Sequence, residues 1–222
     1  MQLGCQGVWQ WIHRVLVAGV ASVVRCWDWA NKNQHRALSI LGIELRRMPI
    51  QIGQKPESDF DNPLGLLSDC HRRIEHFLDV LVRVSESAAG RALSAEERHA
   101  FETALAYFRN SAPKHTADEE ESLFPRMRAT GAFVACLDVL EADHLVAGRD
   151  HELVDGLGGR WLQGKLEPAE TLELSEALSR LSGIYRRHIA VEDTELFPLA
   201  ARVLAESELA DVGREMAARR GV

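Results

Sequence analysis

The chain has 222 residues, and 46% of them are apolar, which is enough to bury one substantial core, so we expect one principal domain. Its formal charge is -7 and it carries no basic stripe with interleaved aromatic residues, so a nucleic-acid partner is not expected. Its four cysteines form no CxxC pair, which argues against a zinc ribbon or a disulfide scaffold and fits a reducing cytoplasm.

Residues 1–58 differ in character from the rest of the chain. Residues 1–47 hold four of the five tryptophans, and a polar stretch with proline and glycine follows them. The apolar run over residues 15–24 is about half as long as a bilayer requires, and no small-residue cleavage site follows it, so we expect neither a membrane span nor export. We predict that residues 1–58 form an N-terminal extension, weakly ordered or partly helical, and that residues 59–222 form the compact domain.

Two long helices are predicted in the first half of this domain. The dipeptide Asn62–Pro63 is typical of a helix start, with a capping side chain followed by a first-turn proline. Ser94 and Glu97 form a capping box that opens the second helix. This helix is predicted to continue through residues 114–127 with a kink or break at Pro113, because the proline ring clashes with the carbonyl group four residues earlier.

Two further long helices and a short one follow. The third helix is predicted to run from Phe133 to Asp155, where the glycines at 156, 158 and 159 are expected to close it. The fourth runs from about Pro168 to about Leu196, and the short helix covers residues 207–220 and packs across one end. We therefore predict an all-α fold, an antiparallel up-down four-helix bundle with a short C-terminal helix.

One constant offset in residue number, the offset that carries His71 onto His144, aligns the two halves of the domain. Each half holds a single His, then at the same spacing a second His, a Glu four residues after it, an acidic residue and the sequence LFP. The aligned residues are His71 with His144, His115 with His188, Glu119 with Glu192, Glu120 with Asp193, and Leu123–Pro125 with Leu196–Pro198.

The repeated HxxxE sequence has the spacing of a helical chelate. A His and a Glu four positions apart differ by about 40° in direction and about 6 Å in rise, so both side chains can converge on one point. Two such pairs, with one further His from each of the other two helices, supply four imidazoles and two carboxylates to the interior of a bundle. Such groups bind iron, manganese or zinc, and a carboxylate can bridge two ions. The predicted ligands of this metal pair are His71, His115, Glu119, His144, His188 and Glu192.

A metal-free interpretation is the alternative. A single HxxxE sequence on a helix is more often a solvated surface pair than a metal site. The common register of the two copies favours the metal interpretation, because chance does not readily repeat a leading His, a chelating pair and LFP. A metal-free helical scaffold predicts that His115→Ala and His188→Ala leave the metal content unchanged.

The pattern of a single His, HxxxE and LFP, given twice between Leu64 and Arg220, resembles the hemerythrin-like (HHE cation-binding) family. The resemblance implies a non-heme di-iron centre in which the four histidines are terminal ligands and Glu119 and Glu192 are bridging ligands. Members of the family bind O2 reversibly, sense oxygen, nitric oxide or iron, or serve in detoxification and iron handling. We accordingly expect two iron ions, with manganese or zinc as alternatives, and O2, peroxide or nitric oxide as small ligands.

The sequence departs from the oxygen-carrying hemerythrins at one position. Those proteins have a second His four residues after the ligand of the third helix, where this chain has Gly148. His151 shares a face with His144 but lies about 10.5 Å further along the helix, so we expect it beside the centre or at the surface and not on the ion. One ion then has an open position for water, Glu120 or substrate, which favours oxidation chemistry or sensing over O2 transport.

Other residues near the predicted ligands have simpler interpretations. His76 is an alternative to His71 as the ligand. It lies about 140° around the helix from His71, and the residue aligned with it in the second half is Arg149 and not a His, so His71 is preferred. Tyr185 could line the pocket or belong to the core. Phe124 and Phe197 are expected to be hydrophobic lids at the bundle end.

The leading hypothesis is a metal-binding module whose di-iron centre meets O2, peroxide or nitric oxide as a sensor, scavenger or carrier. The rival is a di-iron oxidase or peroxidase, and the sequence leaves open whether the protein is an enzyme. Turnover of peroxide far above that of free iron would favour the enzyme.

Overall fold

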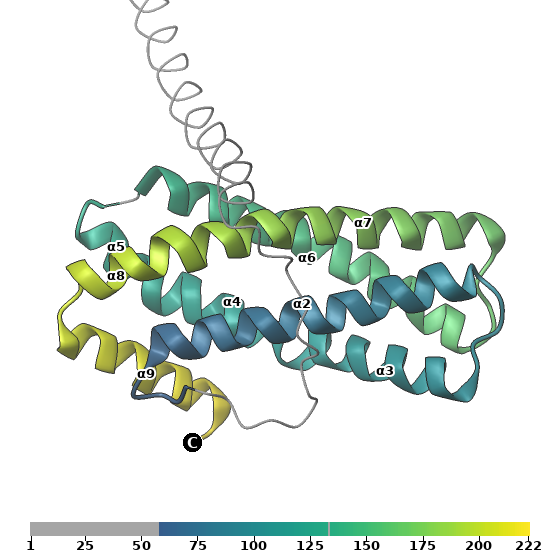
Figure 1. Ribbon diagram of the computed structural model, residues 1–222, viewed down its shortest axis with the longest axis horizontal. Helices are drawn as coiled ribbons and strands as arrows, with labels where there is room; N and C mark the ends of the chain where they lie inside the picture. The colour runs from purple at the N-terminus through teal and green to yellow at the C-terminus, as the bar shows by residue number, and fades with distance from the viewer. Residues whose placement is uncertain (1–57, 133) are drawn as a thin grey trace, which may run out of the picture. The chain divides into compact units, whose positions relative to one another are not determined.

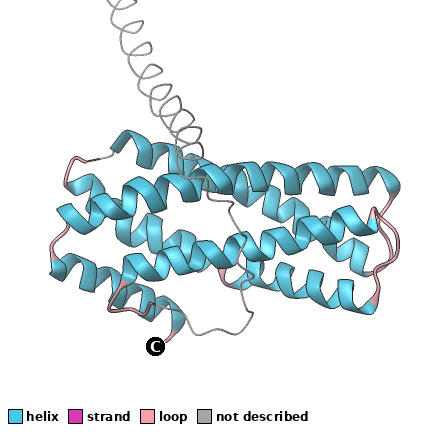
Figure 2. Ribbon diagram, in the orientation of Figure 1, coloured by secondary structure: helices cyan, strands magenta, loops and turns pink. Residues whose placement is uncertain are grey.

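The computed structural model describes residues 58–132 and 134–222, and within these ranges the chain is helical between its turns and contains no strand (Figures 1 and 2). The predicted all-α class is confirmed. The elements are, in chain order, α2 (Pro63–Ala88), α3 (Ala95–Asn110), α4 (Ala112–Ala117), η1 (Asp118–Leu123), α5 (Phe124–Ala129), α6 (Val134–Leu162), α7 (Pro168–Val191), η2 (Glu192–Leu196), α8 (Phe197–Val203) and α9 (Glu206–Arg220). The predicted extension over residues 1–58, with its apolar run, lies outside the described residues except for Ser58 and stays a prediction.

Local side-chain chemistry sets the predicted boundaries in the first half of the domain. The Asn62 side chain accepts a hydrogen bond from the backbone N–H of Gly65 (3.2 Å) and caps α2. At the start of α3, Ser94 Oγ accepts from the N–H of Glu97 (3.2 Å), and the Glu97 carboxylate accepts from the N–H of Ser94 (2.9 Å). The predicted break occurs where Pro113 occupies the first turn of α4.

The prediction that glycines close the third helix is wrong. Helix α6 continues through all three glycines to Leu162. A Cβ atom at Gly158 would lie 2.9 Å from a ring carbon of Phe101 and 3.0 Å from a methyl carbon of Leu105, so this glycine permits close contact between α6 and α3. Beyond it, the buried Trp161 side chain is 3% exposed and anchors the last turn. Tertiary packing here outweighs a glycine cost of about 1 kcal/mol per residue in a helix.

A π-helical turn occurs at the same place in both halves of the domain. Elements η1 and η2 both begin at or directly before the Glu of the HxxxE sequence. In each, the backbone N–H of the LFP phenylalanine donates to the carbonyl oxygen of that Glu, five residues earlier. The sequence predicts α-helix here and misses both turns. Single π-turns within α-helices are frequent at functional sites.

The long helices pack around one another. Helix α2 contacts α3 and α7, α6 contacts the same two helices, and α9 lies against α2, α4 and η1 (Figure 1). Apolar side chains between α2, α3, α6 and α7 form one cluster, which we call the long-helix cluster. A second, the LFP cluster, contains the Leu and Phe of both LFP sequences together with apolar residues of α2, α5, α6, α8 and α9.

The predicted ligands lie at the level between these two clusters. Along α2, Leu67 belongs to the LFP cluster and Ile74 to the long-helix cluster, and His71 lies between them. Along α6, His144 lies in the same way between Leu140 and Ala147. The apolar clusters therefore enclose the polar layer from both sides.

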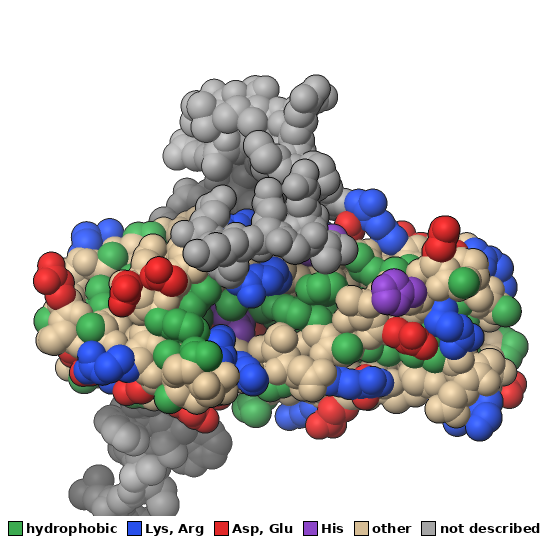
Figure 3. All heavy atoms as spheres, turned by 90° about the horizontal axis from the view of Figure 1, so that it is seen from below, with side chains coloured by type: hydrophobic (Ala, Val, Ile, Leu, Met, Phe, Trp, Pro, Cys, Tyr) green, Lys and Arg blue, Asp and Glu red, His purple; other side chains and the backbone are tan. Residues whose placement is uncertain are grey.

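The face of the domain seen in Figure 3 is mixed in charge. On the face seen in Figure 3, acidic and basic side chains are interspersed, with hydrophobic side chains among them. No helix within the described ranges is both long and apolar enough to cross a membrane.

Candidate metal centre

The six predicted ligands lie together inside the bundle. They are contributed by six elements: His71 by α2, His115 by α4, Glu119 by η1, His144 by α6, His188 by α7 and Glu192 by η2. His144 has the most exposed side chain of the six at 8%, whereas the two Glu side chains are 0% exposed. The helices thus bring residues from distant parts of the sequence to one buried place.

The ligand atoms form two groups that share Glu119. One group comprises His71, His115, Glu119 and Glu192, the other Glu119, His144 and His188, and the ligand atoms of each group lie within 4.8 Å of one another. Glu119 Oε1 lies 3.1 Å from His115 Nε2, and Glu119 Oε2 lies 3.3 Å from His144 Nε2. One carboxylate between two groups of donors is the arrangement that a bridging ligand requires.

The donor atoms of this cluster face one another without the hydrogen bonds that buried polar groups normally make. Within the described structure, both carboxylate oxygens of Glu119 and of Glu192, and Nε2 of His71, are buried without a hydrogen-bond partner. Nε2 of His144 and Nε2 of His188 lie only 3.0 Å apart. An unpaired buried polar group costs about 1–3 kcal/mol, so cations between these atoms would remove several such costs together. The residues present therefore fit metal ions.

Carboxylates of one half orient the imidazoles of the other. Nδ1 of His71 lies 2.9 Å from Asp193 Oδ1, and Nδ1 of His144 lies 2.8 Å from Glu120 Oε1. A carboxylate only accepts, so in the neutral, metal-binding form of each imidazole Nδ1 carries the proton and Nε2 directs its lone pair toward the centre. Glu120, which the sequence offered for an open ligand position, is thus paired with an imidazole and lies outside the two groups of candidate ligands. The sequence analysis missed these roles, although the alignment of Glu120 with Asp193 was a usable signal.

Phenylalanine rings cover the same two imidazoles. Phe197 stacks on His71 with ring centroids 5.4 Å apart and an interplanar angle of 13°, and Phe124 lies parallel to His144 at 6.1 Å and 3°. Both phenylalanines are nearly fully buried. The predicted lids are therefore rings of the LFP cluster that restrict the rotation of two candidate ligands.

Comparison with known proteins bears on this cluster. Residues 62–200, a span that contains all six predicted ligands, match the hemerythrin HHE cation binding domain. The chain belongs to this family. An uncharacterized protein of Haemophilus influenzae is 26% identical over 164 residues, which cover 73% of this chain and 92% of that protein. The resemblance to hemerythrin-like proteins predicted from the repeat is therefore confirmed.

The carboxylates of this hemerythrin HHE domain hold negative charge in its interior. Burial raises the pKa of Glu119, but favourable interactions with the imidazoles of His115, His144 and His71 outweigh burial and hold that pKa well below its ordinary value. Burial and the charge of Glu119 raise the pKa of Glu192, but His188 and His71 lower it below its ordinary value. Two ionised carboxylates in a buried layer need positive charge beside them.

In the metal-free state the imidazoles supply this charge unequally. Burial lowers the pKa of His188, but nearby carboxylates, first of them Glu192, raise it to about 10. Burial acts in the same direction on His71, and its carboxylate neighbours raise its pKa well above the ordinary value. At His115 burial prevails and lowers the pKa to about 4. Only neutral imidazole binds a metal ion, so binding at this hemerythrin site would release protons.

His76, His151 and Gly148 lie outside both groups of candidate ligands. His151 Nε2 lies 2.9 Å from the Tyr185 hydroxyl, and its ring stacks on Phe108. Burial lowers the pKa of His151 to about 4. This places His151 in a packed polar pair beyond the ligand layer, in line with the expectation that it does not bind the ion. Gly148 is exposed, and a Cβ atom there would meet no atom within 4 Å.

Proposed function

We propose that this hemerythrin HHE domain is an antiparallel up-down four-helix bundle that holds a non-heme pair of iron ions. His71, His115, His144 and His188 would be terminal ligands, and Glu119 and Glu192 would bridge the ions. Its metal centre would interact with O2, peroxide or nitric oxide, and the protein would serve in sensing, scavenging or carriage of these ligands. One observation carries the proposal: two groups of buried donor atoms, each confined within 4.8 Å, share the carboxylate of Glu119.

The number of donors supports a function that involves small ligands. Each group offers two imidazoles together with carboxylate oxygens that the two ions would share. A six-coordinate ion held in this way keeps open positions, where O2, peroxide, nitric oxide or water can bind. An additional His at position 148, as in the oxygen carriers, is absent from the sequence. The proposal therefore favours sensing or scavenging over protected O2 carriage.

The metal proposal is tested by composition and spectra. Protein purified without added iron should contain about two ions per chain, and iron-loaded protein should show ferric charge-transfer bands that respond to azide. The matched variants His115→Ala and His188→Ala should each lose metal while the helix content, measured by circular dichroism, is retained. If the purified protein contains manganese or zinc in place of iron, the identity of the metal is revised and the proposed ligands stand, since the same donor set accepts both metals. A colourless, metal-free protein with full helix content would exclude the proposal.

A di-iron oxidase or peroxidase is the second candidate, and the open positions at the ions favour it. The discriminating measurement is peroxide consumption by iron-loaded protein, with free iron at equal concentration as the control. Multiple turnovers per iron pair, well above the control, would favour the enzyme. Binding of nitric oxide or O2 with a spectral change and without turnover would favour the sensor or scavenger. A location in the cytoplasm stays a prediction from the sequence.

A further inference from the structure

The C-terminal helix α9 is joined to η1 through a partly buried ion cluster. Asp118, the first residue of η1, is 0% exposed and directly precedes Glu119. Arg220 donates from Nη2 to Asp118 Oδ2 (2.6 Å) and from Nη1 to Asp118 Oδ1 (3.2 Å), and Arg219 donates from Nη1 to Oδ1 (3.0 Å). Paired, charge-assisted hydrogen bonds of this kind are short and fix orientation. The residue next to the shared candidate ligand is therefore held by two guanidinium groups.

The contact continues along the π-turn. Arg219 also donates to Ser122 Oγ (2.7 Å) and to the Glu121 carboxylate (3.2 Å). Arg126 donates to the backbone carbonyl oxygen of Ser122 (2.8 Å) and to the Glu215 carboxylate of α9 (2.7 Å). Side chains and backbone of η1 are thus bound on both sides of Glu119.

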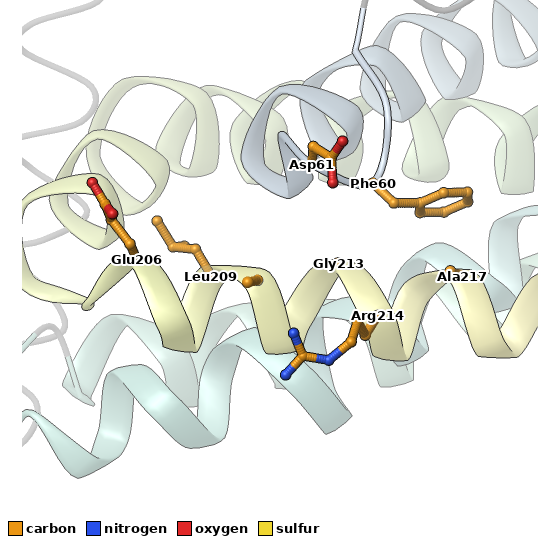
Figure 4. A pocket seen from close by; sticks show the side chains of 8 residues that line it. Phe60, Asp61, Glu206, Leu209, Gly213, Arg214 and Ala217 are labelled. Atoms are coloured by element: carbon orange, nitrogen blue, oxygen red, sulfur yellow. The ribbon is translucent and has the colours of Figure 1, made fainter.

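Helix α9 is itself closely attached to the domain. A Cβ atom at Gly213 would lie 1.9 Å from the carbonyl oxygen of Phe60, so only glycine allows α9 to lie directly on the segment that leads into α2 (Figure 4). Val212 and Met216 are 0% exposed members of the LFP cluster. The Arg220 guanidinium lies 5.9 Å from the centre of the Phe60 ring. The arginines therefore act from a packed support.

The second half of the domain has a different arrangement at the aligned position. Val191 corresponds to Asp118 under the offset that aligns the two halves, and it packs against the LFP cluster. Turn η2 is joined to α2 instead, because Asp193 accepts hydrogen bonds from Ser68 Oγ (2.7 Å) and from His71 Nδ1 (2.9 Å). Of the two π-turns, η1 is the one that α9 binds through charged groups.

We infer that Arg219 and Arg220 are positioning residues for the metal centre. By binding Asp118 they fix the turn that presents Glu119, which lies between both groups of candidate ligands. The inference rests on the proposed function and adds α9 to the elements that build the site. Loss of residues that support a metal ligand typically weakens metal binding about 10- to 100-fold. We call the hydrogen bonds from Arg219 and Arg220 to Asp118 the clamp. Because Glu119 lies between both groups of candidate ligands, loss of the clamp should weaken the binding of both ions.

The test uses the full chain and Co(II), whose visible absorption reports ligand geometry without reaction with O2. Arg220→Gln should bind Co(II) about 10- to 100-fold more weakly in competition with a chelator, and its visible spectrum should change. Arg220→Lys keeps the charge but not the two-pronged hydrogen bonds, so it should recover only part of the affinity. Arg214→Gln is the matched control, because Arg214 lies on the same helix, is 70% exposed and pairs with Asp211. It should bind Co(II) like the wild type.

A second arginine variant and the wild-type protein test the clamp and the proposed function separately. If Arg220→Gln does not fold, Arg219→Gln replaces it, because this variant retains the two hydrogen bonds from Arg220 to Asp118. Affinity and spectrum equal to wild type in the folded arginine variants would overturn the clamp while the proposed function stands. A wild-type protein that binds neither Co(II) nor iron would overturn the proposed function and the clamp together. Weaker binding in Arg220→Gln and Arg214→Gln alike would show a general effect of charge on α9 and also overturn the clamp.

Discussion

His71 and His144 occupy the same position in the two halves of the domain, and their surroundings match. Each ring is bound through Nδ1 by a carboxylate of the opposite half, and each stacks on the LFP phenylalanine of that half. Away from the centre the halves differ. Turn η1 is bound by arginines of α9 through Asp118, whereas the aligned position in the second half is the apolar Val191.

A second difference lies on the other side of the ligand layer. His151 and Tyr185 form a hydrogen-bonded pair in the second half, and the aligned residues of the first half are Leu78 and Ala112. The repeat therefore extends over the residues that face the candidate ions and their direct partners. Outside that layer each half packs in its own way, because different helices cover it.

Substitution of the two carboxylate ligands should show the largest effect of this comparison. Glu119 lies beside His115 and His144, and Glu192 lies beside His71 and His188, so each carboxylate lies between imidazoles of both groups. Glu119→Gln and Glu192→Gln should therefore each reduce the metal content to well below two ions per chain, and by similar amounts. Metal analysis after exhaustive dialysis checks both variants. Retention of both ions by either variant would mean that its carboxylate does not bridge them.

Metal removal should separate the two π-turns. A ligand present at about 100 times its Kd stabilises a folded protein by about 2.7 kcal/mol, so chelation should lower the Tm by several degrees. Amide hydrogen exchange in the metal-free protein should increase more in η2 than in η1, because Arg219 and Arg220 still bind Asp118. Mass spectrometry of exchanged peptides measures this directly. A greater increase in η1 would contradict the account of the clamp.

The carboxylates that orient the imidazoles should have equal effects in the two halves. Asp193→Asn and Glu120→Gln each leave an amide where a carboxylate accepted from Nδ1 of a candidate ligand. We expect each to weaken metal binding about 10-fold. Affinities from chelator competition provide the comparison between the two variants and the wild type. A difference of much more than about 10-fold between Asp193→Asn and Glu120→Gln would show that the symmetry at the centre is only geometric.

The His151–Tyr185 pair should give the smallest effect, a dependence of stability on pH. The pKa of His151 falls from an ordinary 6.5 to about 4 through burial, so between these values the unfolded chain binds more protons than the folded one. Stability due to this residue is fully present above pH 6.5 and is lost as the pH falls toward 4. From about pH 7 to about pH 5.5 the loss amounts to about 1 kcal/mol.

Denaturant unfolding of the chelator-treated protein at the two pH values measures this loss. His151→Leu, which restores the residue type of the aligned Leu78, should reduce the pH dependence by that amount. Tyr185→Phe keeps the imidazole of His151 buried and should therefore leave the pH dependence of stability unchanged. An unchanged pH dependence in His151→Leu would assign the effect to other groups.

Much of the fold and of the candidate site can be predicted from the sequence because the relevant signals are local. Ser94 and Glu97 bind each other's backbone within one turn, and Pro113 breaks its own helix. The HxxxE spacing places His115 next to Glu119 wherever the helix lies. The constant offset between the halves then joins the two copies into one site.

Only the tertiary structure decides the features that depend on contacts between distant residues. Gly158 continues a helix because the α3 helix packs against it, and nothing near it in the sequence indicates this. Asp193 binds an imidazole 122 residues away, and Arg220 binds Asp118 across 102 residues. Sequence determined which groups could bind metal, since residue type and helical spacing set their chemistry. Packing decided which imidazoles lie beside each carboxylate and what holds the turns that carry them, because those depend on which helices meet.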